Sequence, residues 1–408
     1  MPEPRGSTTS EHREHHGCPV ISIDYRENRP AHWTYASLNE VRELAPITWN
    51  DRPREFWMVN RYDEVKEALQ DPDTFTNRVT STLSDPSVKV RLLPQSLNGL
   101  EHTQYRQVLN PWFSPGSVKR IEPLARARCI EMIEELAPRG SCDLAVDFAM
   151  LYPTEVFLAI LGLPTEDGRV LLPLVEGVFR RFFGGDEEET GTFVEELHAY
   201  YKAAIDDRLA TPRDPATDFI TYLLQTETDG APLPREDVQT LCFTIMLAGL
   251  DTTRSELGYI FHHLATHDTD RRMLVDRPDL IPDAVEEFVR LYGLLIQDGR
   301  YVAEDIDFHG CPMKRGDIVW LGLAAADRDP RRFEDPDEFK LDREFTKHLA
   351  FAAGGHRCLG SHLARSELIV ALEEWLQRIP DFRLADDVEL QERGGQLMLV
   401  RVPLQWEV

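Results

Sequence analysis

The chain has 408 residues, of which 42% are hydrophobic and 28% are charged, so it can form a folded core and is not a disordered chain. Its 45 basic and 71 acidic residues give a formal charge of −26, which argues against binding to nucleic acid or to an anionic membrane. No stretch approaches the roughly 18 consecutive apolar residues of a transmembrane helix, and residues 1–18 lack the apolar core of a signal peptide, so we expect a cytoplasmic protein.

Long helical segments alternate with short strand-like segments, and helix dominates. Helices are predicted from residue 62 and at 101–109, 126–136, 148–161, 171–183, 234–264, 285–292 and 368–379, and strands at 56–59, 300–302, 306–308 and 318–321. Residues 79–97 and 327–343 lack periodicity and are predicted as a long loop and an ordered coil. The acidic run 186–189 is predicted as a solvated turn. No repeat or linker divides the chain, so we expect a single domain over residues 1–408, with a flexible tail at 1–20.

Six cysteines lie at positions 18, 129, 142, 242, 311 and 358, and none belongs to a Cys-x-x-Cys pair. This spacing argues against a zinc ribbon or a thioredoxin-like site. A reducing cytosol argues against disulfides, so most of the six are interpreted as small buried apolar residues. Cys358 is the exception.

Residues 351–360 read FAAGGHRCLG and directly precede the last predicted helix. The free amide groups and the dipole at a helix start stabilise an anion, so Cys358 is predicted to have a lowered pKa and to supply a thiolate. His356 and Arg357 flank it with potential positive charge. Glycines 354, 355 and 360 would let a large flat group approach the backbone.

The same ten residues match the haem-ligating motif of the cytochrome P-450 family at Phe351, Gly354, His356, Cys358 and Gly360. The chain therefore resembles a soluble bacterial cytochrome P-450, and the resemblance implies that Cys358 ligates the iron of haem b. It also implies the family's fold: mainly α with small β-sheets, an α-rich triangular prism with the haem between a long central helix and the C-terminal helix. A buried structural cysteine is one alternative. A zinc site of His356, Cys358 and His362 is another, but it lacks a fourth ligand.

Three further segments match the family in the same order. Glu287 and Arg290 form its Glu-x-x-Arg motif, which in the family pairs with an arginine of the coil before the cysteine loop. The candidates for this arginine are Arg328, Arg331, Arg332 and Arg343.

Residues 248–253, with the sequence AGLDTT, resemble the oxygen-binding kink of the family's central helix. Ala248 and Gly249 would lie beside the haem, and Asp251 and Thr252 would be the acid–alcohol pair that delivers protons. A glycine and a back-bonding threonine make a local opening of the helix plausible.

The third segment contains His102 and Arg106, which the resemblance assigns to the haem propionates together with Arg300 and His356. Arginine suits the bidentate geometry of a carboxylate.

The resemblance covers residues 54–406, and residues 374–382 and 402–404 look like the camphor-hydroxylating branch. Val90 stands where that branch has the tyrosine that binds camphor, which argues against camphor itself. The family's substrate pocket maps to mostly apolar residues, so we expect hydroxylation of a compact hydrophobic molecule such as a terpenoid or steroid; this lining comprises Val90, Thr244, Leu247, Ala248, Leu294, Leu295 and Leu397. Arg78, Lys89 and Arg91 could pair with a substrate carboxylate, although a solvent-facing role is favoured.

The chain has no flavin or iron–sulfur motif, so electrons are expected from a ferredoxin and its ferredoxin reductase. We also expect a monomer that acts in secondary metabolism. A candidate docking surface for the ferredoxin is formed by basic residues Lys119, Arg120, Arg126, Arg128, Arg357 and Arg365. The alternatives are a haem-thiolate enzyme of another type (peroxygenase, C–C coupling or desaturation) and a haem sensor or carrier. A Cys–His hydrolase is disfavoured because no third group is evident to orient its base.

Overall fold

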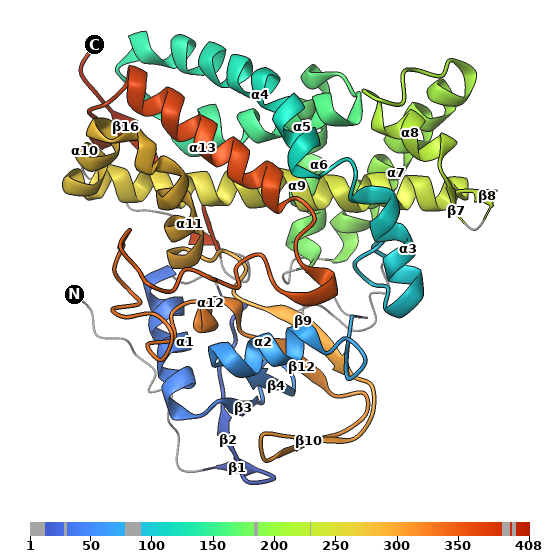
Figure 1. Cartoon of the computed structure of the whole chain (residues 1–408), viewed down its shortest axis with the longest axis vertical. Coiled ribbons are helices and arrows are strands. Elements are labelled where there is room, and N and C mark those ends of the chain that lie inside the picture. Colours follow the sequence, from blue (N-terminus) through green and yellow to red (C-terminus); the bar gives the residue numbers. More distant parts are fainter. Residues whose placement is uncertain are drawn as a thin grey trace.

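The computed structural model describes residues 13–27, 31–77, 91–182, 187–228, 230–385, 392–393 and 397–408. Its central element is helix α9 (Arg235–Thr266), 32 residues long, which crosses the width of the molecule (Figure 1). Pro234 precedes the helix, and Glu236 and Asp237 in its first turn complement the helix dipole. Most of its residues are buried, because other helices pack around it on several sides.

The helices around α9 form the larger part of the molecule (Figure 1). Those that contact it include α5 (Leu151–Leu161), α6 (Gly168–Phe182), α7 (Glu187–Ala210), α8 (Phe219–Gln225), α10 (Asp268–Asp276) and α13 (Ser361–Arg378). Helix α13 also packs along α4 (Pro115–Leu136), and near α11 (Ile281–Leu291). The rings of Phe148, Phe261 and Trp375 join these helices in one aromatic cluster. The remaining helix on this side of the molecule is α3 (Gly99–Leu109).

The strands form small sheets, the largest of which lies beside α1 (Ala31–Leu44) and α2 (Tyr62–Gln70). Its strand order is β1 (Glu14–His15), β2 (Cys18–Ile21), β3 (Ile47–Asn50), β4 (Phe56–Val59), β12 (Ile318–Leu321), β9 (Asp298–Val302) and β5 (Phe75–Thr76). Strands β4 and β12 are parallel, with Trp57 opposite Val319. The other sheets comprise β10 (Ile306–Phe308) with β11 (Cys311–Met313), β6 (Ser141–Asp143) with β13 (Arg383–Leu384) and β16 (Pro403–Gln405), β14 (Glu392–Arg393) with β15 (Met398–Leu399), and β7 (Glu227–Thr228) with β8 (Ala231–Pro232). The predicted fold class, mainly α with small sheets, is confirmed.

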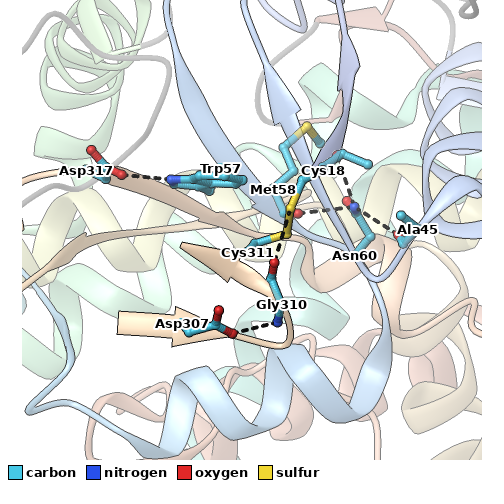
Figure 2. Close-up of a disulfide and its surroundings, with 10 residues drawn as sticks. Cys18, Ala45, Trp57, Met58, Asn60, Asp307, Gly310, Cys311 and Asp317 are labelled. Atoms are coloured by element: carbon cyan, nitrogen blue, oxygen red, sulfur yellow. Dashed lines mark hydrogen bonds between the residues drawn. A yellow bond between two sulfur atoms is a disulfide. The ribbon is translucent and has the colours of Figure 1, made fainter. Parts of the chain in front are cut away.

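Of the flexible tail expected at residues 1–20, residues 1–12 lie outside the described residues, and the remainder carries strands. Residues 14–21 contain strands β1 and β2, and a disulfide joins Cys18 to Cys311 of β11 (Figure 2). Their Cα atoms are 6.1 Å apart, a distance that a disulfide bridges. The expectation that disulfides are absent was wrong for this pair, because residues separated by 293 positions meet only in the folded chain. Buried free thiols do occur, as expected, at Cys129, Cys142 and Cys242.

Most predicted elements are present, with shifted ends. Helix α4 begins at residue 115 rather than 126, and residues 187–189 belong to α7 instead of the predicted turn, whose first residue, 186, lies outside the described residues. The coil at 327–343 consists of turns and irregular structure, as predicted, whereas residues 78–90 of the predicted loop lie outside the described residues. Among the described helices, none is long and apolar enough to cross a bilayer.

Candidate functional site

Cys358 lies in a loop whose backbone is held largely by its own hydrogen bonds. The amide of Cys358 donates to the carbonyl oxygen of Phe351 at 2.9 Å, and the amide of Arg357 donates to Gly354 at 3.2 Å. Gly354 has a φ of +71°, and a Cβ atom there would lie 2.5 Å from the carbonyl oxygen of Leu69 in α2. The motif glycine at 354 is therefore required by a left-handed backbone and by close contact with α2.

The thiol of Cys358 is exposed, yet loss of solvation raises its pKa. Protein atoms near the sulfur thus oppose its ionisation, although the residue is open to solvent. The backbone amide of Gly360 and the charges of Arg106 and Arg357 act in the opposite direction, but they do not outweigh the burial. The prediction of a lowered pKa was thus wrong for the thiol by itself, although metal coordination deprotonates a thiol. His356 adds no positive charge at neutral pH, because burial and nearby cations lower its pKa to about 3.

The middle of α9 has an exposed patch in an otherwise buried stretch. Ala248 is exposed although residues 241–247 are buried, and Thr252, four residues on, lies on the same face. The hydroxyl of Thr252 donates to the carbonyl oxygen of Ala248 at 2.9 Å, as expected of a back-bonding threonine. The helix continues through these residues without the predicted opening. Gly249 instead permits close packing, because a Cβ atom there would lie 2.5 Å from the ring of Phe157 in α5.

Asp251 is buried beside Thr252 and belongs to a chain of charged groups. Its Oδ1 lies 3.9 Å from Nη1 of Arg254, and the same Nη1 lies 2.6 Å from Oε1 of Glu176 in α6. Arg254 therefore connects Asp251 to α6.

The four residues expected at the propionates lie together. The rings of His102 and His356 are 3.9 Å apart, and both Arg106 and Arg300 are close enough to lower the pKa of His356. Burial, followed by the charge of Arg106, lowers the pKa of His102 to about 4. The amide nitrogen of Asn77 lies 3.0 Å from Nδ1 of His356. Because that nitrogen can only donate, it leaves the Nε2–H of His356 to bind another acceptor.

These observations fit the haem that the resemblance implies. The cluster of basic groups depresses the pKa of its own histidines, and such a cluster is stabilised by buried anions such as the two carboxylates of haem b. Arg300 does have one acidic partner, Asp298, at 2.6 Å. Exposed Cys358 offers a sulfur ligand, and exposed Ala248 offers an apolar surface for a flat ring. Within the described residues, no group of three or more His, Cys, Asp or Glu side chains could hold a metal, so the zinc alternative is not supported.

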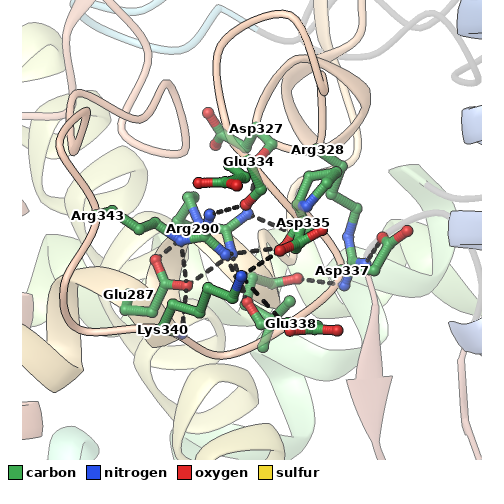
Figure 3. A network of polar contacts seen from close by, with 12 residues as sticks. Glu287, Arg290, Asp327, Arg328, Glu334, Asp335, Asp337, Glu338, Lys340 and Arg343 are labelled. Atoms are coloured by element: carbon green, nitrogen blue, oxygen red, sulfur yellow. Dashed lines mark hydrogen bonds and ion pairs between the residues drawn. The ribbon is translucent and has the colours of Figure 1, made fainter.

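Glu287 and Arg290 of α11 form a buried network with the coil (Figure 3). Their side chains pair at 2.7 Å, and Nε of Arg343 lies 2.8 Å from Oε1 of Glu287. Arg343 is therefore the coil arginine that the sequence left undetermined among four candidates. The guanidinium groups of Arg290 and Arg343 also donate to carbonyl oxygens of the coil, at residues 327, 334, 335, 336 and 338.

The predicted substrate-pocket residues fall into two groups. Leu295 is 37% exposed and Ala248 is exposed, so both offer apolar surface. The others are buried: Thr244, Leu247, Leu294 and Leu397. Leu294 and Leu397 are adjacent, because the amide of Leu397 donates to the carbonyl oxygen of Leu294 at 3.0 Å. Val90, Arg78 and Lys89 lie outside the described residues, and Arg91 pairs with Asp237 at 2.7 Å.

Ion pairs neutralise much of the predicted docking surface. Arg126 contacts three glutamates, at positions 122, 373 and 374. Arg128 pairs with Glu155, and Arg365 pairs with Glu286. Lys119, Arg120 and Arg357 are exposed. Sequence reasoning missed Asn77 and Phe157, since neither belongs to a recognisable motif.

Comparison with known proteins is consistent with this geometry. Residues 163–408 match the family model described as cytochrome P450. The chain is 32% identical to the mycinamicin IV hydroxylase/epoxidase of Micromonospora griseorubida over 90% of this chain and 94% of that protein. It is also 32% identical to the probable cytochrome P450 127A1 of Sinorhizobium fredii, over 86% and 83% of the two chains. The crystal structure of CYP101J2 is similar at a TM-score of 0.86 and 30% identity, covering 95% of this chain and 97% of that one.

Proposed function

Because this chain belongs to the cytochrome P450 family, we propose that it hydroxylates a compact hydrophobic small molecule, terpenoid- or steroid-like, with electrons from a ferredoxin and its reductase. The family gives the reaction class, a haem-thiolate monooxygenase that uses haem b and dioxygen. We further propose that the protein works as a monomer in the cytoplasm. Similarity to a mycinamicin hydroxylase supports a role in secondary metabolism.

The exposed cysteine at position 358, held in a hydrogen-bonded loop, is the observation that carries this proposal. Cys358 would ligate the iron, Phe351 and Gly360 would shape the loop around it, and the cluster of His102, Arg106, Arg300 and His356 would hold the propionates. When bound, haem supplies the activation of dioxygen, helped by electron donation from the thiolate. Ligation of the iron, binding of the propionates and delivery of protons fall to side chains of this chain.

Proton delivery is assigned to Thr252 and Asp251. The Thr252 hydroxyl can turn from its bond with Ala248 and pass a proton to an acceptor in the exposed space beside α9. Asp251, next in the helix, would resupply that proton while Arg254 holds its carboxylate in place. The pair would set how much of the consumed dioxygen appears in product.

The substrate class rests on the apolar surface offered by Ala248 and Leu295, next to the adjacent pair Leu294 and Leu397. Such a lining binds by excluding water and places few polar demands on its ligand. Arg91 is paired with Asp237, so it does not favour a substrate carboxylate.

The ferredoxin would dock through Lys119, Arg120 and Arg357, the exposed part of the basic surface. A chain with a formal charge of −26 repels an acidic partner elsewhere, so a small basic area can orient its approach.

The test combines spectroscopy with a substrate panel. A carbon monoxide difference spectrum of the reduced holoenzyme should show the haem-thiolate band, and terpenoids or steroids should shift the spin state and yield a hydroxylated product. A panel in which only aromatic acids bind would contradict the proposed substrate class, and absence of the band would contradict ligation by Cys358.

Thr252→Ala should uncouple the reaction, because the proton-donating hydroxyl is lost. We expect dioxygen consumption to continue while the share that appears in product falls severalfold. Thr266→Ala is the matched control, since Thr266 makes the same i−4 bond at the solvent end of α9. Equal coupling in the two variants would contradict the role of Thr252.

A further inference from the structure

A line of polar side chains follows one face of α9 from Thr252 toward the end of the helix. Glu256, Tyr259 and His263 follow Thr252 at spacings of four, three and four residues, which places them on the same helix face. Thr252 and His263 are eleven residues apart, a rise of about 16 Å. The line therefore connects the middle of the molecule with the solvent end of α9.

Glu256 is an unusual group for such a position. Its side chain is 4% exposed, and within the described residues its buried Oε1 has no hydrogen-bond partner. Burial raises its pKa to about 8, so the carboxyl group holds a proton at neutral pH. An unpaired buried polar atom costs stability, and a packing role would be better filled by an apolar residue. Asp251 differs, because it is near the guanidinium of Arg254.

Tyr292, directly after α11, interacts with both Glu256 and a histidine. The charge of Glu256 is one cause of the raised pKa of Tyr292, after burial and the opposing effect of Arg328. The hydroxyl of Tyr292 lies 2.7 Å from Nδ1 of His263. The rings of Tyr259 and Tyr292 stack at 5.5 Å, which holds Tyr292 against α9.

His263 in turn leads to the surface. Its Nε2 lies 2.9 Å from Oδ2 of Asp270 in α10, so the imidazole joins Tyr292 on its Nδ1 side to Asp270 on its Nε2 side. The tautomer decides which nitrogen donates, and with hydrogen on Nδ1 the ring donates to the oxygen of Tyr292. His263 and Asp270 line a pocket of about 310 Å³, together with exposed His267. Figure 1 shows α10 and α11 beside this end of α9. Water in the pocket can therefore exchange protons with the Asp270–His263 pair.

We propose that Glu256 is a proton reservoir for Thr252, refilled from this pocket through Asp270, His263 and Tyr292. Its carboxyl proton passes toward the Thr252 hydroxyl one helical turn away, directly or through a bridging water. The hydroxyl of Tyr292 gives its proton to Glu256 and takes the Nδ1 hydrogen of His263. Nε2 of His263 then takes a proton from Asp270, which is reprotonated by water in the pocket. Only protons move along the path, and each that leaves is replaced by one from solvent. The monooxygenase reaction consumes them, since reducing one oxygen atom to water takes two protons and two electrons.

The inference rests on the proposed role of Thr252. Two titratable groups near this part of α9 could affect the protonation of Glu256. Tyr292 interacts with Glu256 electrostatically, and Glu367 of α13 forms a hydrogen bond with Thr253 of α9. Burial raises the pKa of both groups, and neither a phenol nor a carboxyl group supplies a cation that would ionise Glu256.

The test uses the holoenzyme with Glu256→Gln, which keeps the shape of the side chain but removes its acidic proton. Infrared difference spectra across pH 6–10 should show a protonated carboxyl band that disappears near pH 8 in the parent protein and is missing in the variant. Coupling of dioxygen to product should fall severalfold, and the solvent isotope effect on product formation should rise. Tyr292→Phe should shift coupling in the same direction.

His262→Gln is the matched control. His262 is adjacent to His263, also has its pKa lowered by burial, to about 4, and lies on a different face of α9. It should retain parental coupling. The relay is overturned if the carboxyl band is absent from the parent, or if Glu256→Gln keeps full coupling while Thr252→Ala loses it. Full coupling in Thr252→Ala contradicts instead the proposed role of Thr252.

Discussion

The coil of residues 327–343 and the cysteine loop of residues 349–360 are neighbouring irregular segments, but they are held in different ways. Buried guanidinium groups of Arg290 and Arg343 bind carbonyl oxygens along the coil (Figure 3). The cysteine loop bonds mainly to itself and depends on backbone conformations such as that of Gly354. An irregular segment can thus be ordered from outside by side chains or from within by its own backbone.

The largest effect is expected from Glu287→Ala, which leaves Arg290 and Arg343 buried without their shared carboxylate. Breaking a buried ion pair costs about 3–5 kcal/mol, so urea unfolding should show a loss of this size together with poor haem retention. The control is Asp63→Ala, which removes an exposed partner of Arg332 and should cost less than about 1 kcal/mol. Equal losses would show that the coil does not depend on the buried network.

Gly354→Ala tests whether the cysteine loop depends on its own backbone conformation. Alanine would have to adopt the left-handed backbone of this position, and its methyl group would approach three backbone atoms of Leu69 and Gln70 in α2. We therefore expect a loss of about 1–3 kcal/mol in unfolding free energy. Gly316→Ala is the comparison, because Gly316 has a φ of +93° but nothing within 4 Å of the added atom. The unfolding free energy of that variant should fall by about 1 kcal/mol, which is the cost of placing alanine in a left-handed backbone. A smaller loss for Gly354→Ala would mean that the loop moves away from α2 easily.

The smallest effect is expected at the ion pair between Arg365 and Glu286, which lies beside the cysteine loop. Arg365 lies 4.4 Å over the ring of Phe351 and pairs with Glu286 of α11, which also accepts from His348. Burial opposes ionisation of Glu286, but these hydrogen bonds prevail and lower its pKa to about 2.

Because the pKa of Glu286 is lower in the folded protein than the ordinary value of 4.5, the ionised carboxylate stabilises the fold at pH values above 4.5. This contribution to the unfolding free energy is lost as the pH falls from 4.5 toward 2. Glu286→Gln should therefore remove a pH-dependent part of the unfolding free energy between these values. Because Glu286 is about one-third exposed, the expected change is below about 1 kcal/mol. Identical acid profiles for parent and variant would contradict the assigned pKa.

Features formed by consecutive or regularly spaced residues could be predicted from the sequence, whereas contacts between distant residues could not. The cysteine loop was predictable because its residues are consecutive, and the helix at 361–378 because its apolar spacing is regular. The choice of Arg343 among four arginines required the path of the coil, which has no periodicity to interpret. The thiol pKa of Cys358 was misjudged because burial, unlike neighbouring charge, is not visible in a motif. Gly249 was assigned to an opening of the helix, whereas its partner Phe157 lies far away in the sequence.

The disulfide between Cys18 and Cys311 changes the covalent connectivity of the chain (Figure 2). It closes the chain into a covalent ring that contains helices α1 to α11, while the cysteine loop and α13 lie on a free arm after residue 311. A protease cut inside the ring would leave one covalent molecule until the disulfide is reduced. A cut between residues 311 and 358 would leave the segment that carries Cys358 held only by non-covalent packing, such as that of α13 against α4.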